Sequence, residues 1–312
     1  MTNPRRVDVH HHVVPPGYKA WLRDRGLAAG GLPVPDWSVE ASLAQMDERG
    51  VETAILSVSM PGVHLGDDAE ARARAREVNE YAAKVVHDHP ARFGFFATLT
   101  LPDVDGALAE LAYACDTLRA DGVVLLANSR GVYLGDPRFD PLFDELNRRR
   151  AVVFVHPSTL PGLEPLPGVP TFVADFLLDT TRAAIGLVRS GTLERCPDVK
   201  VILSHAGGFL PYAAYRVGLA ASPSANAPEG AARLQRFYFD TALSSSPTAL
   251  PSLLAFAAPG HVLFGTDFPY APAFVVETFT RLYERFGTPD AQRASIDRGA
   301  AERLFPRLRR SA

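Results

Sequence analysis

Apolar, β-rich runs recur along this chain at intervals of roughly thirty to fifty residues, and this spacing constrains the fold more than any other feature. There are eight such runs, at residues 7–12, 52–60, 93–101, 122–127, 152–157, 199–208, 237–242 and 261–270. Between them lie segments with apolar residues at three- and four-residue steps and charges on the opposite side, such as "VEASLAQMDERG" and "PLFDELNRRR". This alternation predicts strands and helices in turn, with the strands in a parallel sheet that helices cover on both sides.

The number of strands favours a closed sheet. Eight strands, each followed by a helix, close into a (β/α)8 barrel, the TIM barrel. An open, doubly wound sheet is the alternative, but no glycine-rich phosphate-binding turn follows the first predicted strand. No repeat or linker divides the 312 residues, so we expect a single domain over 1–312. The Pro-rich stretch 157–170 is the longest irregular segment and is a candidate lid or pocket wall.

Composition and charge argue against several classes of function. A formal net charge of -3 does not suit a nucleic-acid partner. No run approaches the ~20 apolar residues of a membrane helix, and the N-terminus lacks the apolar region of a signal peptide. The two cysteines, Cys115 and Cys196, cannot build a disulfide framework. We therefore expect a cytoplasmic protein with neither a nucleic-acid nor a membrane partner.

Three consecutive histidines, His10, His11 and His12, end the first predicted strand. Because successive strand side chains point to opposite faces, His10 and His12 share one face and His11 takes the other. Imidazole is the commonest metal ligand in proteins, and two imidazoles on one side of a strand end can share one ion. A tag-like or solvated histidine cluster would lie in a polar tail, whereas these residues lie inside a strand pattern.

Reactive side chains also follow later strands, at the C-terminal ends where barrel enzymes carry their active sites. His156 ends the run "VVFVH", His205 ends "VILSH", and Asp267 ends "LFGTD". Any one of them alone could be a buried, hydrogen-bonded group. Together with the two first-strand histidines, they offer imidazoles and a carboxylate that suit one divalent ion such as zinc.

Four motifs in order, "DVHHH", "VHP", "SHAGG" and "GTDFPY", resemble the amidohydrolase-2 branch of the amidohydrolase superfamily. The relatives in question are the aminocarboxymuconate-semialdehyde, 6-methylsalicylate and resorcylate type decarboxylases, and the resemblance covers nearly the whole chain. It implies one divalent metal ion per chain, Zn2+ or else Mn2+, bound by His10, His12, His156 and Asp267. It also implies that His205 contacts a metal-bound water or the substrate.

Two departures from the family pattern bear on the metal and the substrate. Binuclear members need a carboxylated lysine on a middle strand, but the lysines here stand only at 19, 84 and 200, so we expect no second bridged ion. The muconate branch has an arginine in the helix before the second strand, whereas this chain has none there until Arg49. Loss of that cation favours an aromatic ring with a single carboxylate. The resorcylate branch has Glu where this chain has His10, so that subgroup does not match.

These features predict a metal-dependent, non-oxidative decarboxylase, a carboxy-lyase that releases CO2 from a 2-hydroxybenzoate such as 6-methylsalicylate. An acid must protonate the ring carbon; Asp267 and His205 are the candidates, and we favour Asp267 with His205 as electrostatic support. Aromatic residues near these positions are candidate walls for the ring: Phe209, Tyr212, Phe268 and Tyr270. A hydrolase of an amide, ester or lactone is the alternative, because the same ion could supply hydroxide. A metal-holding binding protein without activity is a third reading.

Arg216 lies eleven residues after His205, on the helix that "GGFLPY" is expected to begin. At ~1.5 Å rise per residue this position is some 15 Å from the barrel mouth, too far for easy contact with the metal of its own chain. Arg216 matches an arginine that, in the muconate branch, reaches the substrate carboxylate of a neighbouring subunit. The resemblance therefore implies a homodimer, whereas a solvated or salt-bridged surface arginine is the alternative.

Overall fold

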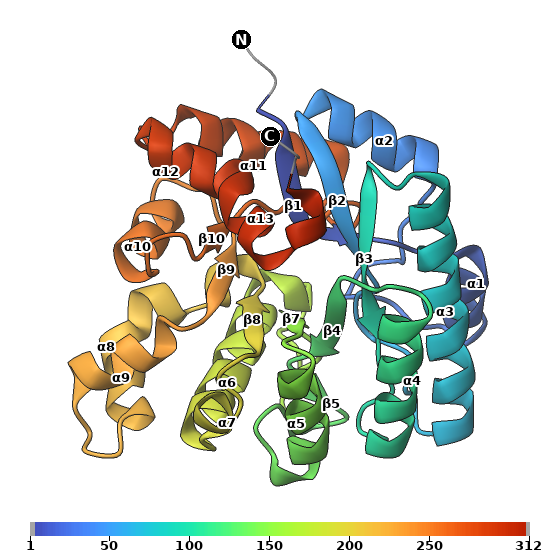
Figure 1. The fold of residues 1–312 in the computed structure, drawn as a ribbon, viewed down its shortest axis with the longest axis horizontal. Helices are drawn as coiled ribbons and strands as arrows, with labels where there is room; N and C mark the ends of the chain where they lie inside the picture. Colours follow the sequence, from blue (N-terminus) through green and yellow to red (C-terminus); the bar gives the residue numbers. More distant parts are fainter. Residues whose placement is uncertain (1–3, 310–312) are drawn as a thin grey trace.

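The computed structural model describes residues 4–309 and contains one parallel sheet of eight strands. The strands follow one another in chain order around the sheet (Figure 1): β1 (Arg6–His12), β2 (Val51–Ser57), β3 (Phe93–Thr98), β4 (Gly122–Leu126), β7 (Val152–His156), β8 (Lys200–Leu203), β9 (Tyr238–Asp240) and β10 (Val262–Leu263). Backbone hydrogen bonds from Val9 N to Phe264 O (3.0 Å) and from His12 N to Phe268 O (2.7 Å) bring the two edges together. The sheet is thus a nearly closed barrel, and the predicted (β/α)8 fold is confirmed.

Helices surround the barrel, as Figure 1 shows. Their bounds are α1 (Pro16–Asp24), α2 (Val39–Glu48), α3 (Asp68–Asp88), α4 (Val104–Asp116), α5 (Asp140–Arg148), α6 (Asp175–Arg189), α7 (Thr192–Arg195), α8 (Leu210–Ala221), α9 (Ala227–Leu234), α10 (Ala249–Phe256), α11 (Ala273–Arg285), α12 (Asp290–Ala294) and α13 (Ala300–Leu304). Several begin at a side-chain cap; the carboxylate of Asp67, for example, accepts from the backbone N–H of Glu70 at the start of α3. Within residues 4–309, no helix is both long and apolar enough to cross a membrane.

Two hydrophobic cores hold the layers together. The inner core fills the barrel with strand residues such as Val9, Phe96 and Phe154, and Phe305 after α13 packs against it. The outer core lies between the strands and the surrounding helices, with Leu111 and Leu187 among its fully buried members. Because the strands are buried on both sides, they appear in the sequence as continuous apolar runs.

Several strands are shorter than the apolar runs that predicted them. The run 199–208 contains β8, which ends at Leu203, and the run 261–270 contains only the two residues of β10. The backbone leaves the extended conformation at His205 (φ 52°), Ala206 (φ 58°) and Asp267 (φ 64°). Left-handed residues cannot continue a strand, so the chain turns at the points where the reactive side chains stand.

A small hairpin, β5 (Asn128–Ser129) and β6 (Val132–Tyr133), follows β4 outside the barrel and was not expected from the sequence. Its base is pinned by the buried carboxylate of Asp179 on α6, which accepts from Asn128 Nδ2 (2.9 Å) and Tyr133 Oη (2.7 Å). The same carboxylate accepts from the backbone N–H of Ser158 (2.8 Å), at the start of the Pro-rich segment 157–170. The hairpin and this segment are therefore anchored at one point.

Candidate metal centre and the cavity beside it

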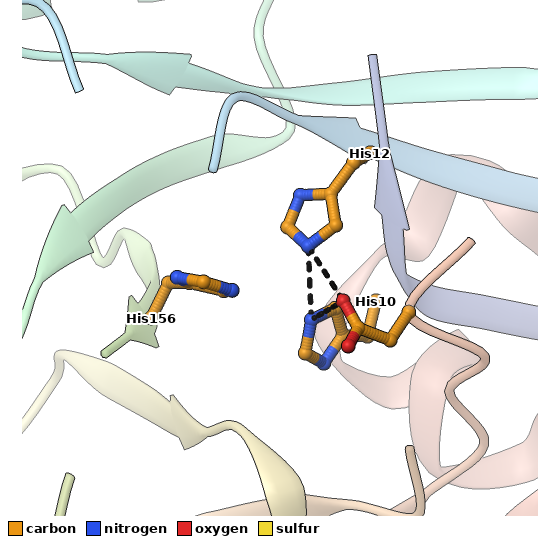
Figure 2. A group of neighbouring side chains, drawn as sticks. His10, His12 and His156 are labelled. Carbon is orange, nitrogen blue, oxygen red and sulfur yellow. Dashed lines mark hydrogen bonds and ion pairs between the residues drawn. The ribbon is translucent and has the colours of Figure 1, made fainter. Parts of the chain in front are cut away.

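Four predicted ligands from three distant parts of the chain meet at the C-terminal mouth of the barrel. One ligand atom from each of His10, His12, His156 and Asp267 lies within 4.8 Å of the others, and all four residues are buried. The Nε2 atoms of His10 and His12 are 3.1 Å apart, and Asp267 Oδ1 lies 3.1 Å and 3.0 Å from them. Figure 2 shows the three imidazole rings directed at one space, His156 from the side opposite His10 and His12.

The second nitrogen of each imidazole is held by an oxygen that can only accept. His10 Nδ1 donates to the carboxylate of Asp240 (2.8 Å). His12 Nδ1 donates to the carbonyl of Ser57 (3.1 Å), and His156 Nδ1 donates to the carbonyl of Pro157 (2.9 Å). In the neutral rings each Nε2 atom then offers a lone pair to the common space. This is the tautomer and orientation that metal-binding histidines adopt, so the donor set fits a divalent ion.

The pKa shifts of the four residues also agree with a site for a divalent ion. Burial alone would lower the pKa of His10, but Asp240 and Asp267 outweigh it and raise this pKa to about 10. Burial lowers the pKa of His12 and, well below its usual value, that of His156. Burial alone would raise the pKa of Asp267, but the neighbouring imidazoles, above all His10, hold it well below its usual value. Without an ion the cluster thus needs one proton as its cation, and a divalent ion can take that place.

His205 stands beside this group without joining the tight set. It follows β8 in a short 3-10 turn, and its Nε2 atom lies 3.4 Å from Asp267 Oδ2. Its backbone N–H donates to Asp240 Oδ1 (3.0 Å). Its Nδ1 atom is buried and has no hydrogen-bond partner within residues 4–309. His205 therefore presents a ring to Asp267 from the side where a substrate could lie.

Asp240 and Asp8 are two buried carboxylates of this region that sequence reasoning missed. Asp240 ends β9 and holds both His10 and the backbone of His205. The signal was present, because "FYFD" is an apolar run that ends in a polar residue, like the runs before His156 and His205. Asp8 accepts from the backbone N–H of His10 (3.0 Å) and from both the N–H (3.1 Å) and the hydroxyl (2.5 Å) of Thr266. Asp8 thus ties the first strand to the residue before Asp267.

His11 points away from the cluster, on the side expected from strand alternation. Its Nδ1 atom lies 3.1 Å from Asp8 Oδ2, and its Nε2 atom lies 3.0 Å from the hydroxyl of Ser42 on α2. The pairing of β1 with β2 shifts register between Asp8 and His11. A bulge of this kind re-aims side chains and is common next to active sites. His11 is thereby part of the wall between β1 and α2.

Two neighbouring cavities, which share part of their lining, open on the metal ligands, and we call them the inner and the outer chamber. The inner chamber has a volume of about 280 Å³ and adjoins His156 and Asp267. The outer chamber has a volume of about 560 Å³ and adjoins His205 and Asp267. Both are lined by four shared apolar residues: Phe172, Phe176, Leu243 and Val275.

The aromatic residues predicted to line a ring pocket are distributed over three places. Tyr270 lines the inner chamber, with its ring 5.1 Å from that of His12. Phe209 and Tyr212 line the outer chamber. Phe268 lines neither chamber; it packs behind β1, 5.2 Å from the ring of His11, because its side chain takes the opposite side of the backbone from Asp267.

Phe172 and Phe176 were not singled out from the sequence, although they wall both chambers. They follow the Pro-rich segment 157–170, in the turn before α6 and in its first residues. The ring of Phe176 is 6.1 Å from that of His156. Within the predicted segment, residues 158–161 line a separate cavity of about 380 Å³ next to the hairpin. The walls of the two chambers come instead from its C-terminal continuation, for which the sequence carries no periodic signal.

Arg216 lies on the exposed side of α8, away from both chambers of its own chain. Within residues 4–309, it has neither an ion pair nor a hydrogen bond from its side chain. Its neighbours on the helix are exposed apolar side chains, Tyr212 at 90%, Tyr215 at 64% and Leu219 at 51% exposure. An unpaired cation among exposed aromatic residues is unusual on a surface that faces only water.

Comparisons with known proteins agree with this geometry. A 6-methylsalicylic acid decarboxylase of Penicillium expansum is 41% identical over 314 residues, which cover 97% of each chain. A protein of Aspergillus niger, the decarboxylase yanB, is 40% identical over 98% of this chain and 89% of its own. The crystal structure of an amidohydrolase II superimposes with a TM-score of 0.91 at 30% identity, over 96% of this chain and 99% of that chain. The pattern of the amidohydrolase family matches residues 7–307. The resemblance seen in the four motifs is thus confirmed, and the chain belongs to the amidohydrolase family.

Proposed function

We propose that this protein is a metal-dependent, non-oxidative decarboxylase of a 2-hydroxybenzoate such as 6-methylsalicylate, which it converts with release of CO2. The observation that carries the proposal is the group of three imidazole Nε2 atoms that converge beside Asp267 at the floor of an apolar chamber. The relatives from Penicillium and Aspergillus, at 40% and 41% identity, support decarboxylation, and the name of one of them gives the acid.

His10, His12, His156 and Asp267 would hold one divalent ion, zinc in the first place and manganese as the alternative. When bound, the ion would take the carboxylate and the ortho oxygen of the substrate and favour loss of the phenolic proton. Asp240 would keep His10 in the tautomer that offers Nε2. The ring would lie against the apolar walls that Phe176 and Tyr270 contribute.

Asp267 is the residue that we propose to protonate the ring. As a metal ligand, Asp267 would start as a carboxylate, with Oδ1 beside His10 and His12, and Oδ2 would be free to accept the proton that the phenol gives up. Asp267 then passes this proton to the carboxyl-bearing ring carbon, which becomes tetrahedral. The bond to the carboxylate breaks, CO2 leaves, and the bonding electrons return to the ring. His205, 3.4 Å from Asp267 Oδ2, supports the charge as it moves.

A substrate panel tests this function against its hydrolytic alternative. Metal-loaded protein is offered salicylate, 6-methylsalicylate and 2,6-dihydroxybenzoate, and separately a set of aryl esters and lactones. The proposal expects CO2 from at least one hydroxybenzoate, detected with the phenol formed from it in equal amount. Turnover of esters or lactones without any CO2 release would establish the hydrolase instead. A protein that binds metal but acts on neither set would be the binding protein.

The homodimer is a second part of the proposal. Tyr212, Tyr215 and Leu219 give α8 an exposed apolar side, and Arg216 stands unpaired among them. In a dimer this side would be covered, and the planar guanidinium of Arg216 could grip a substrate carboxylate in the chamber of the partner with two hydrogen bonds. Arg216→Lys should then raise KM with unchanged metal content, and the wild type should sediment as a dimer.

The matched control for Arg216 is Arg189→Lys, an exposed arginine at the end of α6 with no hydrogen bond from its side chain within residues 4–309. It should leave KM unchanged. A fully active monomer, or an Arg216→Ala protein with the KM of the wild type, would remove Arg216 from the site. A cytoplasmic location completes the proposal and is supported by Cys115 and Cys196, which are both unpaired.

A further inference from the structure

The walls of the inner chamber are apolar everywhere except beside the metal ligands. They consist of loop residues Ala29, Leu32, Pro33 and Pro35, of Met60, and of aromatic rings from Phe172 and Phe176. Apart from His156 and Asp267, its lining includes only two polar side chains, Ser59 and Tyr270, and no lysine, arginine, asparagine or glutamine. The hydroxyl of Ser59 lies 3.5 Å from His156 Nε2, and so it belongs to the metal side of the chamber.

The hydroxyl of Tyr270 does not change this description. It is buried and has no hydrogen-bond partner within residues 4–309. The ring of Tyr270 packs edge-on against that of His12, which keeps it on the metal side. The remaining wall therefore offers no side-chain hydrogen bond to the far edge of a bound ring.

The size of the inner chamber exceeds what an unsubstituted ring needs. A dry cavity of about 150 Å³ lined by leucine, isoleucine and phenylalanine is enough to bind benzene. The inner chamber measures about 280 Å³, close to twice that volume. When the carboxylate and ortho hydroxyl of a substrate lie at the metal ligands, the ring fills one part and space remains against the apolar wall.

We infer that the inner chamber selects 2-hydroxybenzoates by the alkyl group on the ring edge, accepts ethyl and propyl groups as well as methyl, and discriminates against a hydroxyl in that place. This inference rests on the proposed function for its reaction, and it adds the class of substituent. An alkyl group buries apolar surface against Leu32, Met60 and Phe176, which is worth roughly fourfold in binding per methylene. A hydroxyl against these three residues loses its water and finds no side-chain partner among them, and apolar pockets reject such isosteres by roughly ten- to a hundredfold.

The test is a series of acids that differ at one ring position. Steady-state rates of the metal-loaded protein are measured with salicylate and with its 6-methyl, 6-ethyl, 6-propyl and 6-hydroxy derivatives. We expect kcat/KM for the ethyl compound to equal or exceed that for the methyl compound, and the hydroxy compound to lie at least tenfold below it. A hydroxy compound that matches the methyl compound, or an ethyl compound more than a hundredfold below it, would overturn the inference.

One substitution places a hydroxyl on the wall without changing its shape. Val275 lines both chambers from the first turn of α11 and is only partly buried, so Val275→Thr should fold. It should raise the ratio of hydroxy to methyl kcat/KM by roughly threefold or more. The matched control is Val86→Thr on α3, a partly buried valine that packs against the outer core and should leave the ratio unchanged. If the ratio of hydroxy to methyl kcat/KM is the same in Val275→Thr and Val86→Thr, the ring substituent does not lie against the wall that Val275 lines.

Equilibrium binding separates this inference from the proposed function. The same five acids are titrated into metal-loaded protein, and their dissociation constants are measured by calorimetry. If no acid releases CO2 but the alkyl compounds bind at least tenfold more tightly than 6-hydroxysalicylate, the decarboxylase function fails and the assignment of the chamber stands. If CO2 is released but neither kcat/KM nor the dissociation constant depends on the ring substituent, the function stands and the inference fails.

Discussion

Strand β1 carries a buried charged cluster at each end, and the two clusters differ in what they still need. At its start, the guanidinium of Arg6 donates to Asp297 Oδ1 (3.0 Å), Glu284 Oε1 (2.9 Å) and the carbonyl of Arg49 (2.6 Å). The rings of Phe264 and Tyr283 cover its faces. Every donor nitrogen of this arginine thus has an acceptor from its own chain, and Arg6 is only 3% exposed.

At the other end of the same strand, nitrogen and oxygen atoms that can act as metal ligands face one another. The three imidazoles use Nδ1 to donate hydrogen bonds to fixed oxygens. Their Nε2 atoms point at one space beside the carboxylate of Asp267; the rings belong to His10, His12 and His156. Without an ion, the positive charge of this group is a proton on His10, whose pKa, against the effect of burial, Asp240 and Asp267 raise to about 10. A buried cluster that is complete within its own chain serves the fold, whereas one that lacks a partner of defined charge is prepared for a ligand. The four predictions below test that distinction.

Loss of a ligand should have the largest effect. His12→Ala removes one of the three Nε2 atoms, and we expect metal affinity to fall more than a hundredfold, since changes in outer partners alone cost ten- to a hundredfold. Activity should be lost with the metal. His11→Ala is the control, because its ring lies behind β1 against Ser42. Elemental analysis of both variants decides: equal metal content, or two ions per wild-type chain, would contradict the site.

Arg6→Met should instead act on the fold. Removing Arg6 leaves the buried carboxylate of Asp297 without its cation, although the hydroxyl of Tyr283 still donates to it (3.0 Å), and costs about 3–5 kcal/mol. The free energy of unfolding, measured in urea on metal-loaded protein, should fall by that amount, while metal stoichiometry stays the same. Arg189→Met on the exposed side of α6 should change stability by about 0.5 kcal/mol at most. Loss of metal from Arg6→Met would contradict the separation of a structural cluster at the start of β1 from a metal-binding cluster at its end.

Removal of the metal should destabilise the protein without unfolding it. Ion present at a hundred times its dissociation constant stabilises the folded state by about 2.7 kcal/mol. Addition of a chelator should lower the melting temperature, and added metal should restore it. The same shift is expected in Arg6→Met, because the two clusters share no residue and their contributions add. A melting temperature that ignores the chelator would show that the cluster does not need an ion.

The smallest of the four effects is expected from Asp240→Asn. The amide keeps the shape but cannot accept from His10 Nδ1 and from the His205 backbone with the same strength. Metal affinity should fall ten- to a hundredfold, measured by competition with a chelating dye. Asp297→Asn, at the other end of β1, should lower stability and leave metal affinity intact. If Asp297→Asn instead lowers metal affinity while Asp240→Asn lowers only stability, the roles assigned to the two clusters are wrong.

The sequence predicts those parts of the molecule in which an apolar run ends directly at a functional residue. β1 and β7 end at His12 and His156, so strand patterning alone placed three of the four candidate ligands. Asp267 and His205 were found as residues, but their left-handed backbones were not, because a φ value depends on the turn that the barrel mouth imposes. Asp240 was missed although its run has the same form, since β9 is short and contains only three residues.

The chambers were the least predictable part. Their walls come from Ala29 and Leu32 before α2, from Phe172 and Phe176 after the Pro-rich segment, and from Val275 in α11. No periodic pattern connects these positions, because loops that reach the barrel mouth meet only through the closed sheet. Phe268 shows the same limit: its place next to Asp267 in the sequence suggested a pocket wall, whereas its side chain packs against His11.

The division of labour between strand ends and loops gives this protein two separately adjustable parts. The candidate ligands stand at or just after β1, β7 and β10, where the barrel fixes their spacing. Phe172 and Phe176 reach the same cavities from a surface segment that crosses no strand. Pro157 holds His156 and Ser158 is bonded to Asp179, so changes after Ser158 and up to Phe176 can reshape the substrate volume while the reaction centre keeps its geometry. Related proteins with this fold can therefore acquire different acid substrates through changes in one surface segment.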